Sequence, residues 1–266
     1  MTIEARKTFE EIKSMYSSDN AVNTFNCITY GLLGTGKTYS LRTARKPVLI
    51  YSFDPGGTKV LKEEIERGEV MVVLCENENA KAPTEFRKWE DMFMQHRRER
   101  LFEQVGTVVI DSLTFWADAC MSEVMKTNVA NRAKAIPGIP IMQDWMIQMR
   151  VMSDHLRLLT TLPCDTILNA HIDSERDEVT GKIFTSLMIT GKLKRKVPLL
   201  FDELYVSMSV PSSTGSSYVW LTQNDGIYEA KTRLGVKNTF EKYEPQDYKA
   251  LLKKAGYDTE DKPLLT

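Results

Sequence analysis

The amino-acid sequence predicts an α/β protein with a mostly parallel sheet covered by helices on both faces and a C-terminal antiparallel β extension. Apolar runs alternate with helical stretches through the first 172 residues. Because parallel strands need long crossover connections, this alternation favours a parallel sheet. A glycine-rich segment, GLLGTGKT, separates the first apolar run from the helix that follows it. Later apolar runs follow one another without helices, which indicates antiparallel pairing.

The hydrophobic pattern places each element in chain order. Helices are expected within residues 1–20, 38–45, 83–104, 113–132, 142–161 and 247–257. Strands of the parallel sheet are expected at 25–30, 46–53, 68–76, 106–112 and 164–172. The extension is expected to contain a hairpin around Thr180 and Gly181 and strands at 203–210, 216–223 and 226–233.

The composition is that of an average globular protein. Of 266 residues, 35 are Lys or Arg and 36 are Asp or Glu, so the formal net charge is −1. This balance excludes a uniformly basic nucleic-acid binder and allows only a local basic patch. The four cysteines form no CxxC pair and are expected to be reduced core residues. Without a signal-peptide pattern or an apolar run of roughly 18 residues, the chain is expected to be cytoplasmic and to have no membrane span.

Residues 31–38 match the phosphate-binding pattern G-x-x-x-x-G-K-[ST] in full. The glycines let successive backbone N–H groups point at phosphate oxygens, and the following helix adds its positive end. In this pattern Lys37 reaches the β- and γ-phosphates of ATP, and the Thr38 hydroxyl ligates Mg²⁺. Tyr39 either walls the nucleotide or packs on its helix. The expected nucleotide-binding residues are Gly31, Gly34, Thr35, Gly36, Lys37, Thr38 and Tyr39.

Two aspartates follow apolar runs and are candidates for the metal side and for catalysis. An acid at the end of a neighbouring strand holds Mg²⁺ in P-loop ATPases, which favours Asp111 over the alternative of an aspartate that only caps a turn. Ser112 stands where many such enzymes carry a water-activating carboxylate. Asp54 is the best candidate for that role, because it ends a strand at the same edge of the sheet. The alternative is that Asp54 only begins the turn DPGG.

These pieces together resemble the RecA family of P-loop ATPases. GLLGTGKT, YSFD, VVIDS and LNAH occur in the family's order over roughly residues 25–235. The chain looks most like the compact RecA-like ATPases encoded by bacteriophages and prophages, some of which are single-strand annealing proteins or recombinases. The resemblance implies a RecA-like core at 25–240, preceded by an N-terminal helix and linker at 1–24 and followed by a helical tail at 241–266. It also places Asp54 where RecA has Glu and His171 where RecA has Gln.

Three further residues are candidate catalytic groups. An imidazole at His171 would donate to a γ-phosphate oxygen and relay its presence to the following hairpin; the alternative is an ordinary histidine at a strand end. The resemblance makes Lys231 and Arg233 a Lys-x-Arg pair that enters a neighbouring subunit's nucleotide site. Residues i and i+2 of a strand face the same way, so both cations would reach one phosphate cluster. The alternative is a solvated basic strand edge.

Few basic residues are candidates for contact with nucleic acid. Two clusters lie where RecA-type proteins have flexible DNA-facing loops, although a charge run is more often a solvated surface. The candidates for contact with single-stranded DNA are Arg132, Lys134, Lys192, Lys194, Arg195 and Lys196.

The leading hypothesis is a Mg²⁺-dependent ATPase that acts on single-stranded DNA in phage-type recombination or replication. It would form a homo-oligomer, a ring or a filament, with active sites at subunit interfaces. The alternative is a nucleotide-dependent assembly module, such as a packaging or replication accessory, with little hydrolysis. A nucleotide or metabolite kinase shares the P-loop, but no Arg-rich lid segment is evident.

Overall fold

The structure is a computed structural model that describes residues 3–18, 24–76, 79, 82–128, 135–136, 138–176, 178, 181–212, 215–235 and 239–265. Its strands are β1 (Asn26–Gly31), β2 (Val48–Ser52), β3 (Val70–Leu74), β4 (Thr107–Asp111), β5 (Asp165–Arg176), β6 (Ile183–Leu187), β7 (Glu203–Ser212), β8 (Gly215–Leu221) and β9 (Tyr243–Pro245). Its α-helices are α1 (Ile3–Ser17), α3 (Lys37–Ser40), α4 (Lys62–Glu66), α5 (Glu85–Arg98), α6 (Leu113–Thr127), α7 (Met142–Leu159), α8 (Leu193–Leu200) and α9 (Tyr248–Lys254). Three 3₁₀ turns are η1 (Leu41–Thr43), η2 (Gly57–Leu61) and η3 (Leu101–Glu103).

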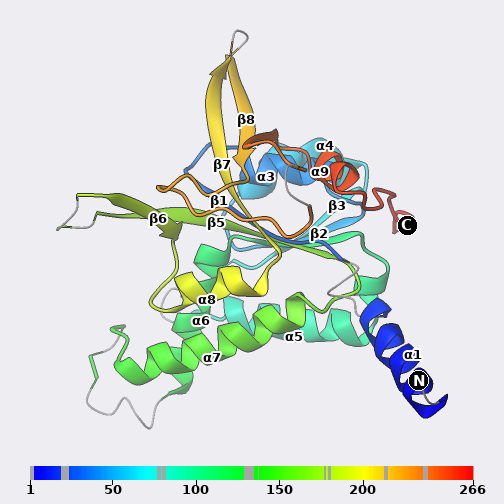
Figure 1. Ribbon diagram of the computed structural model, residues 1–266. Coiled ribbons are helices and arrows are strands. Elements are labelled where there is room, and N and C mark those ends of the chain that lie inside the picture. The colour runs from blue at the N-terminus through cyan, green and yellow to red at the C-terminus, as the bar shows by residue number, and fades with distance from the viewer. Residues whose placement is uncertain are drawn as a thin grey trace.

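A single sheet organises the fold (Figure 1). Its strand order is β3-β2-β4-β5-β1-β7-β8-β9, and β6 pairs with the far half of β5. The six strands from β3 to β7 in this order are parallel, whereas β6, β8 and β9 are antiparallel to their neighbours. The predicted architecture, a mostly parallel α/β sheet with a C-terminal antiparallel extension, is confirmed.

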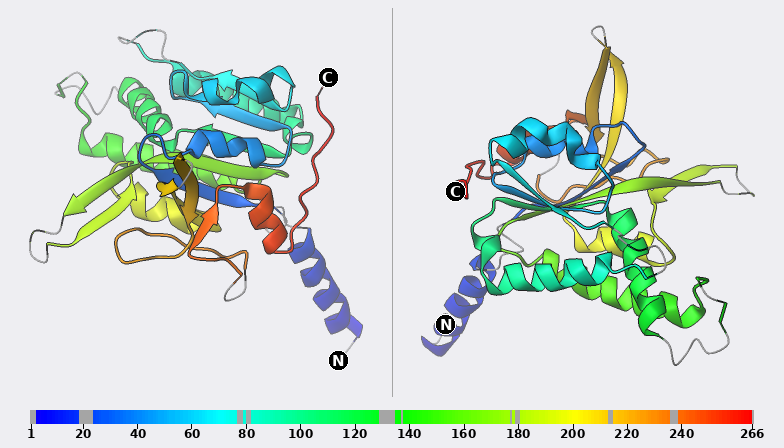
Figure 2. Two further views of the ribbon diagram at one scale, coloured as in Figure 1. Left: turned by 90° about the horizontal axis from the view of Figure 1, so that it is seen from above. Right: turned by 180° about the vertical axis from the view of Figure 1, so that it is seen from behind.

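Helices cover both faces of the sheet. In Figure 1, α5, α6, α7 and α8 lie below it, and α3, α4 and α9 lie above it; the right-hand view of Figure 2 shows the same layers from behind. Side chains that alternate along a strand fill the two layers in turn: Val109 of β4 packs above, and Val108 and Ile110 pack below. A strand buried on both faces is apolar at most of its positions, which explains the nearly continuous apolar runs in the sequence.

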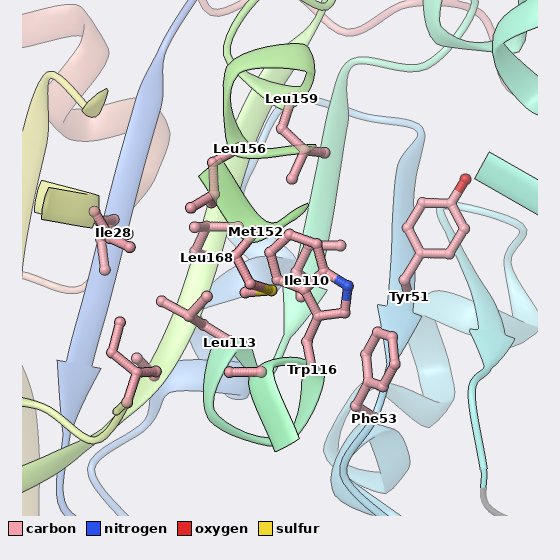
Figure 3. Packing of buried hydrophobic residues seen from close by; sticks show 14 of the residues in the cluster. Ile28, Tyr51, Phe53, Ile110, Leu113, Trp116, Met152, Leu156, Leu159 and Leu168 are labelled. Carbon is pink, nitrogen blue, oxygen red and sulfur yellow. The ribbon is translucent and has the colours of Figure 1, made fainter. Parts of the chain in front are cut away.

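The larger core lies below the sheet. Figure 3 shows Trp116 of α6 and Met152 and Leu156 of α7 packed against Ile110 and Leu168 of the central strands. All five side chains are fully buried. This packing fixes α6, which begins two residues after Asp111, against the edge of the sheet that carries the predicted site.

All four cysteines are buried and free, as expected for core residues: Cys27, Cys75, Cys120 and Cys164. Burial raises the pKa of the Cys75 and Cys164 thiols to about 12. Burial also raises the pKa of Cys27 and Cys120. In the part of the chain that the structure describes, no helix combines the length and apolar character needed to cross a bilayer.

Several local predictions need correction. The helix after the phosphate-binding loop is a single turn, α3, continued by η1. The strand expected to end at 172 runs on to Arg176, because its last five residues pair with β6. The segment 226–233 is not a strand and makes only isolated bridges, at Tyr228 and Lys231. Residues 193–200 form α8 rather than a flexible loop.

One buried ion pair ties the segment after η1 to the start of β5. The Asp165 carboxylate accepts hydrogen bonds from Arg45 Nε (2.6 Å) and from the backbone N–H of Phe25 (2.9 Å). Only 2% of the Asp165 side chain is exposed. Burial raises the pKa of Asp165, and the guanidinium opposes that shift. The carboxylate therefore depends on Arg45 for compensation of its charge.

Replacing Arg45 with Met should lower the free energy of unfolding by about 3–5 kcal/mol, because it leaves a buried carboxylate uncompensated. Urea denaturation followed by circular dichroism measures the loss. Arg150→Met is the matched control, since Arg150 pairs with Asp154 on the exposed surface of α7 and such pairs add little. Equal losses in the two variants would contradict the structural role of Arg45.

Candidate nucleotide-binding site

The predicted phosphate-binding loop joins the end of β1 to α3. Gly34 and Gly36 have φ angles of 71° and 85°, in the left-handed region that favours glycine. At Gly31 a Cβ atom would lie 2.4 Å from the carbonyl oxygen of Ser207. Lys37 Nζ donates to the carbonyl oxygens of Gly31 (2.9 Å) and Leu32 (2.8 Å). The backbone of the loop is thus curled, and the ammonium group of Lys37 folds back onto it.

The structure brings Thr38 and Asp111 together from 73 positions apart. Thr38 Oγ1 donates to Asp111 Oδ2 at 2.8 Å. Asp111 is 3% exposed. Burial raises the pKa of its carboxyl, while the hydrogen bond from Thr38 lowers it in part. Burial also lowers the pKa of Lys37, and the charges of Asp111 and Asp54 oppose that shift.

The donor atoms at this point fit Mg²⁺. A hydroxyl and a carboxylate are hard oxygen ligands, and Mg²⁺ usually takes one or two protein oxygens together with substrate phosphates. Among the residues that the structure describes, no cluster of three or more His, Cys, Asp or Glu side chains is arranged to hold a metal. The two oxygen atoms of Thr38 and Asp111 match the one or two protein ligands that Mg²⁺ takes beside substrate phosphates.

Asp54 lies beside this pair and is held by two partners. Ser112 Oγ donates to Asp54 Oδ1 at 2.8 Å, and His171 Nε2 lies 3.4 Å from Asp54 Oδ2. The backbone N–H of His171 donates to Thr114 Oγ1 (3.1 Å), and the ring packs edge-on against Phe115. The carbonyl of Asp54 also accepts from Gly57. Asp54 thus begins a turn, as one interpretation held, and also presents its carboxylate to the site.

The residues of the phosphate loop, Asp54, Asp111 and His171 line one cavity of about 520 Å³. It is lined by Leu33, Gly34, Thr35, Gly36, Lys37, Thr38, Tyr39, Asp54, Gly57, Val60, Asp111, His171 and Tyr218. A larger groove of about 650 Å³ lies between α7 and the segment before α8, but its lining is mostly apolar. Charged groups suited to phosphate chemistry converge in the smaller cavity. Tyr39 both lines that cavity and packs against Arg42 and Tyr218.

Lys231 and Arg233 lie elsewhere. The Lys231 backbone pairs with Leu204 near the start of β7, and its ammonium donates to the carbonyl of Pro198. Arg233 Nη1 lies 3.3 Å from Asp202 Oδ1. Neither residue is among those that line the cavity, so the structure does not bring the predicted Lys-x-Arg pair to the phosphate loop.

The basic residues expected to contact DNA are only partly described. Lys192 precedes α8, and Lys194, Arg195 and Lys196 lie on its first turns. The Lys194 ammonium is paired with Glu175 of β5. Lys192 and Arg195 are exposed. Arg132 and Lys134 lie outside the described residues.

Comparison with known proteins identifies the family. Residues 24–234 match the family model of an AAA domain. The chain belongs to this AAA domain family. Among curated proteins, the search found no match. Among solved structures, the chain is similar to the KaiC-like protein PH0186 from the hyperthermophilic archaeon Pyrococcus horikoshii OT3, with 11% identity and a TM-score of 0.41 over 81% of this chain and 82% of that chain.

Sequence analysis did not anticipate Ser112, Tyr218 or Gln246 as site residues, and Gln246 lies beyond the matched residues 24–234. Ser112 was noted only for not being a carboxylate, yet it donates to Asp54. Tyr218 of β8 reaches the cavity from about 180 positions after the loop. Gln246 Nε2 donates to the carbonyl of Thr35 in the loop (2.9 Å). The last two contacts arise from tertiary pairing and leave no local signal in the sequence.

The metal side of the AAA domain makes one prediction. Asp111→Asn should reduce the gain in ATP affinity that Mg²⁺ provides by roughly 10- to 100-fold, as for other residues that orient a metal ligand. Isothermal titration with Mg²⁺ and with EDTA measures that gain. Asp91→Asn, on the exposed face of α5, is the control. If Mg²⁺ raised the ATP affinity of Asp111→Asn as much as that of the parent, the role of Asp111 as a metal ligand would be contradicted.

Proposed function

We propose that this AAA domain is a Mg²⁺-dependent ATPase that acts on single-stranded DNA in phage-type recombination or replication, with active sites at subunit interfaces. The observation that carries the ATPase proposal is the convergence in one cavity of three groups. These are the lysine of the phosphate loop, the Thr38–Asp111 pair and a second carboxylate, Asp54. Hydrolysis of a phosphoanhydride requires this division of labour between charge neutralisation and water orientation.

Each group has a definite task in in-line attack of water on the γ-phosphate. Lys37 binds the β- and γ-phosphate oxygens. Thr38 and Asp111 would hold Mg²⁺, which neutralises phosphate charge when bound. Asp54 accepts a hydrogen bond from the attacking water and orients it. A carboxylate has about four lone-pair sites, so the contacts with Ser112 and His171 leave Asp54 able to accept that bond.

His171 is suited to sense the γ-phosphate. It sits where the parallel part of β5 ends and the antiparallel part begins, opposite Gly31 in the register. Its imidazole is within reach of Asp54, and its strand continues into the hairpin with β6. A γ-phosphate that binds the imidazole would therefore draw it away from Asp54 and would also affect the hairpin formed by β5 and β6.

One observation keeps slow hydrolysis as a second candidate. Both oxygens of Asp54 already have a protein partner, which favours an ordered carboxylate but leaves less of it for water. In that case the domain would be a nucleotide-dependent assembly module for packaging or replication. The turnover number with and without single-stranded DNA separates the two candidates.

The catalytic acid generates the first prediction. Asp54→Asn should slow ATP hydrolysis by about 10²- to 10⁴-fold while ATP still binds, because the change removes the group that orients water but no nucleotide ligand. Phosphate release measures hydrolysis, and calorimetry measures binding. Asp91→Asn is again the control. Full turnover in Asp54→Asn would place the acid elsewhere.

A second prediction concerns the proposed subunit interface. Lys231 and Arg233 of one subunit would stabilise charge in a neighbour's site, so specific activity should rise with protein concentration and then level off. Arg233→Ala should lose on the order of 10³-fold in rate. A mixture of Arg233→Ala with Lys37→Ala should recover part of it, because some interfaces then combine an intact loop with an intact arginine. Activity that is independent of concentration and not rescued by mixing would contradict a role in trans.

The third prediction concerns DNA. Lys192, Arg195 and Lys196 changed together to Ala should weaken single-strand binding and reduce the slope of log K against log salt by about 2, since each lost phosphate contact removes roughly 0.7. Fluorescence anisotropy over a salt series measures the slope. The matched control changes Arg87, Arg97 and Arg98, three exposed arginines of α5. An unchanged slope would show that α8 is only solvated surface.

A further inference from the structure

The nucleotide cavity has two chemically different ends. At one end lie Asp54, two residues beyond the end of β2, and His171 of β5. At the other end lies Tyr218, carried by β8, with the phosphate loop of β1 between them. Strand order separates β5 from β8 by three spacings, roughly 14 Å. Tyr218 therefore lies on the side of the phosphate loop opposite the acid end.

An aromatic wall forms that second end. The rings of Tyr39 and Tyr218 have centroids 6.2 Å apart and planes tilted by 49°. They are 43% and 39% exposed, and both line the cavity. The Arg42 guanidinium lies 4.6 Å from the centroid of Tyr39 and pairs with Glu64. Tyr39 is thus backed by a fixed cation while much of the wall faces the cavity.

Gln246 holds this wall against the phosphate loop. Its Nε2 donates to the carbonyls of Thr35 in the loop (2.9 Å) and of Val219 in β8 (3.0 Å). A Cβ atom on Gly36 would lie 2.5 Å from Gln246 Oε1 and 3.0 Å from the ring of Tyr218. The ring of Tyr218 therefore packs directly against the backbone of the phosphate loop.

We infer that the base of the bound nucleotide stacks on the wall formed by Tyr39 and Tyr218, and that the site selects purine nucleotides by stacking area. This inference rests on the proposed nucleotide site and extends it to the nucleoside. Aromatic stacking is favourable for every base and stronger for larger ones. Tyr218 is then the contact through which the β7–β8 hairpin, which rises away from the rest of the sheet in Figure 1, meets the nucleotide.

The same wall discriminates little between adenine and guanine. The described lining residues of the cavity include no amide side chain, and their carboxylates are Asp54 and Asp111, which the proposed function uses at the phosphate end. A site without such groups cannot strongly reject a base of similar size. ATP and GTP should therefore bind within about tenfold of each other, and UTP more weakly than either.

Affinities for ATP and for inorganic triphosphate, measured by calorimetry on the full chain, test the inference. Tyr218→Ala should weaken ATP on the order of tenfold and leave triphosphate unchanged, because only the stacked base is lost. Tyr218→Phe keeps the ring and should bind ATP like the parent. Tyr243→Ala removes a tyrosine of similar exposure on β9, outside the cavity, and should change neither affinity.

Each other outcome overturns the inference. Unchanged ATP affinity in Tyr218→Ala would place the base elsewhere, and equal weakening of ATP and triphosphate would make Tyr218 merely structural. A preference for ATP over GTP above a hundredfold would mean that a hydrogen-bonding group reads the base edge. Failure of the proposed nucleotide site has a different signature: the parent would bind neither ATP nor triphosphate, or Lys37→Ala would bind both as well as the parent.

Discussion

The contacts of the site depend on the register of four parallel strands that end at one edge. Gly31 of β1 lies beside His171 of β5, and Asn169 of β5 lies beside Asp111 of β4, which in turn lies beside Ser52 of β2. A slip of one residue in any pairing would turn the side chains that follow it to the opposite face. The two buried layers oppose such a slip, because it would exchange the side chains that pack in them, such as Val109 above the sheet and Ile110 below it. The apolar core thus sets the distance between Thr38 and Asp111.

Much of this arrangement could be predicted, because its signals are local. The phosphate loop is a continuous motif, and an acid after an apolar run marks the end of a strand wherever that strand lies in the sheet. Parallel strands share one carboxyl edge, so Asp54 and Asp111 were expected near the loop without knowledge of the strand order. The five strands up to residue 172 were placed for the same reason, since burial on both faces gives each a continuous apolar run.

The remaining features depend on packing between distant segments. Tyr218 and Gln246 reach the loop only because β8 and β9 extend the sheet beyond β7. The strand expected around Lys231 is absent because its backbone is held elsewhere: the buried carboxylate of Glu203 accepts hydrogen bonds from the N–H groups of Arg233 (2.7 Å) and Leu234 (3.0 Å). A carboxylate without water makes such bonds in preference to leaving its charge unpaired. The hydrophobic periodicity of residues 226–233 gives no sign of these hydrogen bonds to Glu203.

The burial of all four thiols has a practical consequence for spectroscopy. Thiolates, not thiols, react with maleimides, and burial of Cys27, Cys75, Cys120 and Cys164 suppresses both ionisation and access. The chain therefore carries a natural background without reactive sulfur. A single cysteine introduced on the exposed face of the β7–β8 hairpin would accept one fluorophore or spin label without prior removal of native residues. Distances from that hairpin to a labelled nucleotide then become measurable in an otherwise unaltered sequence.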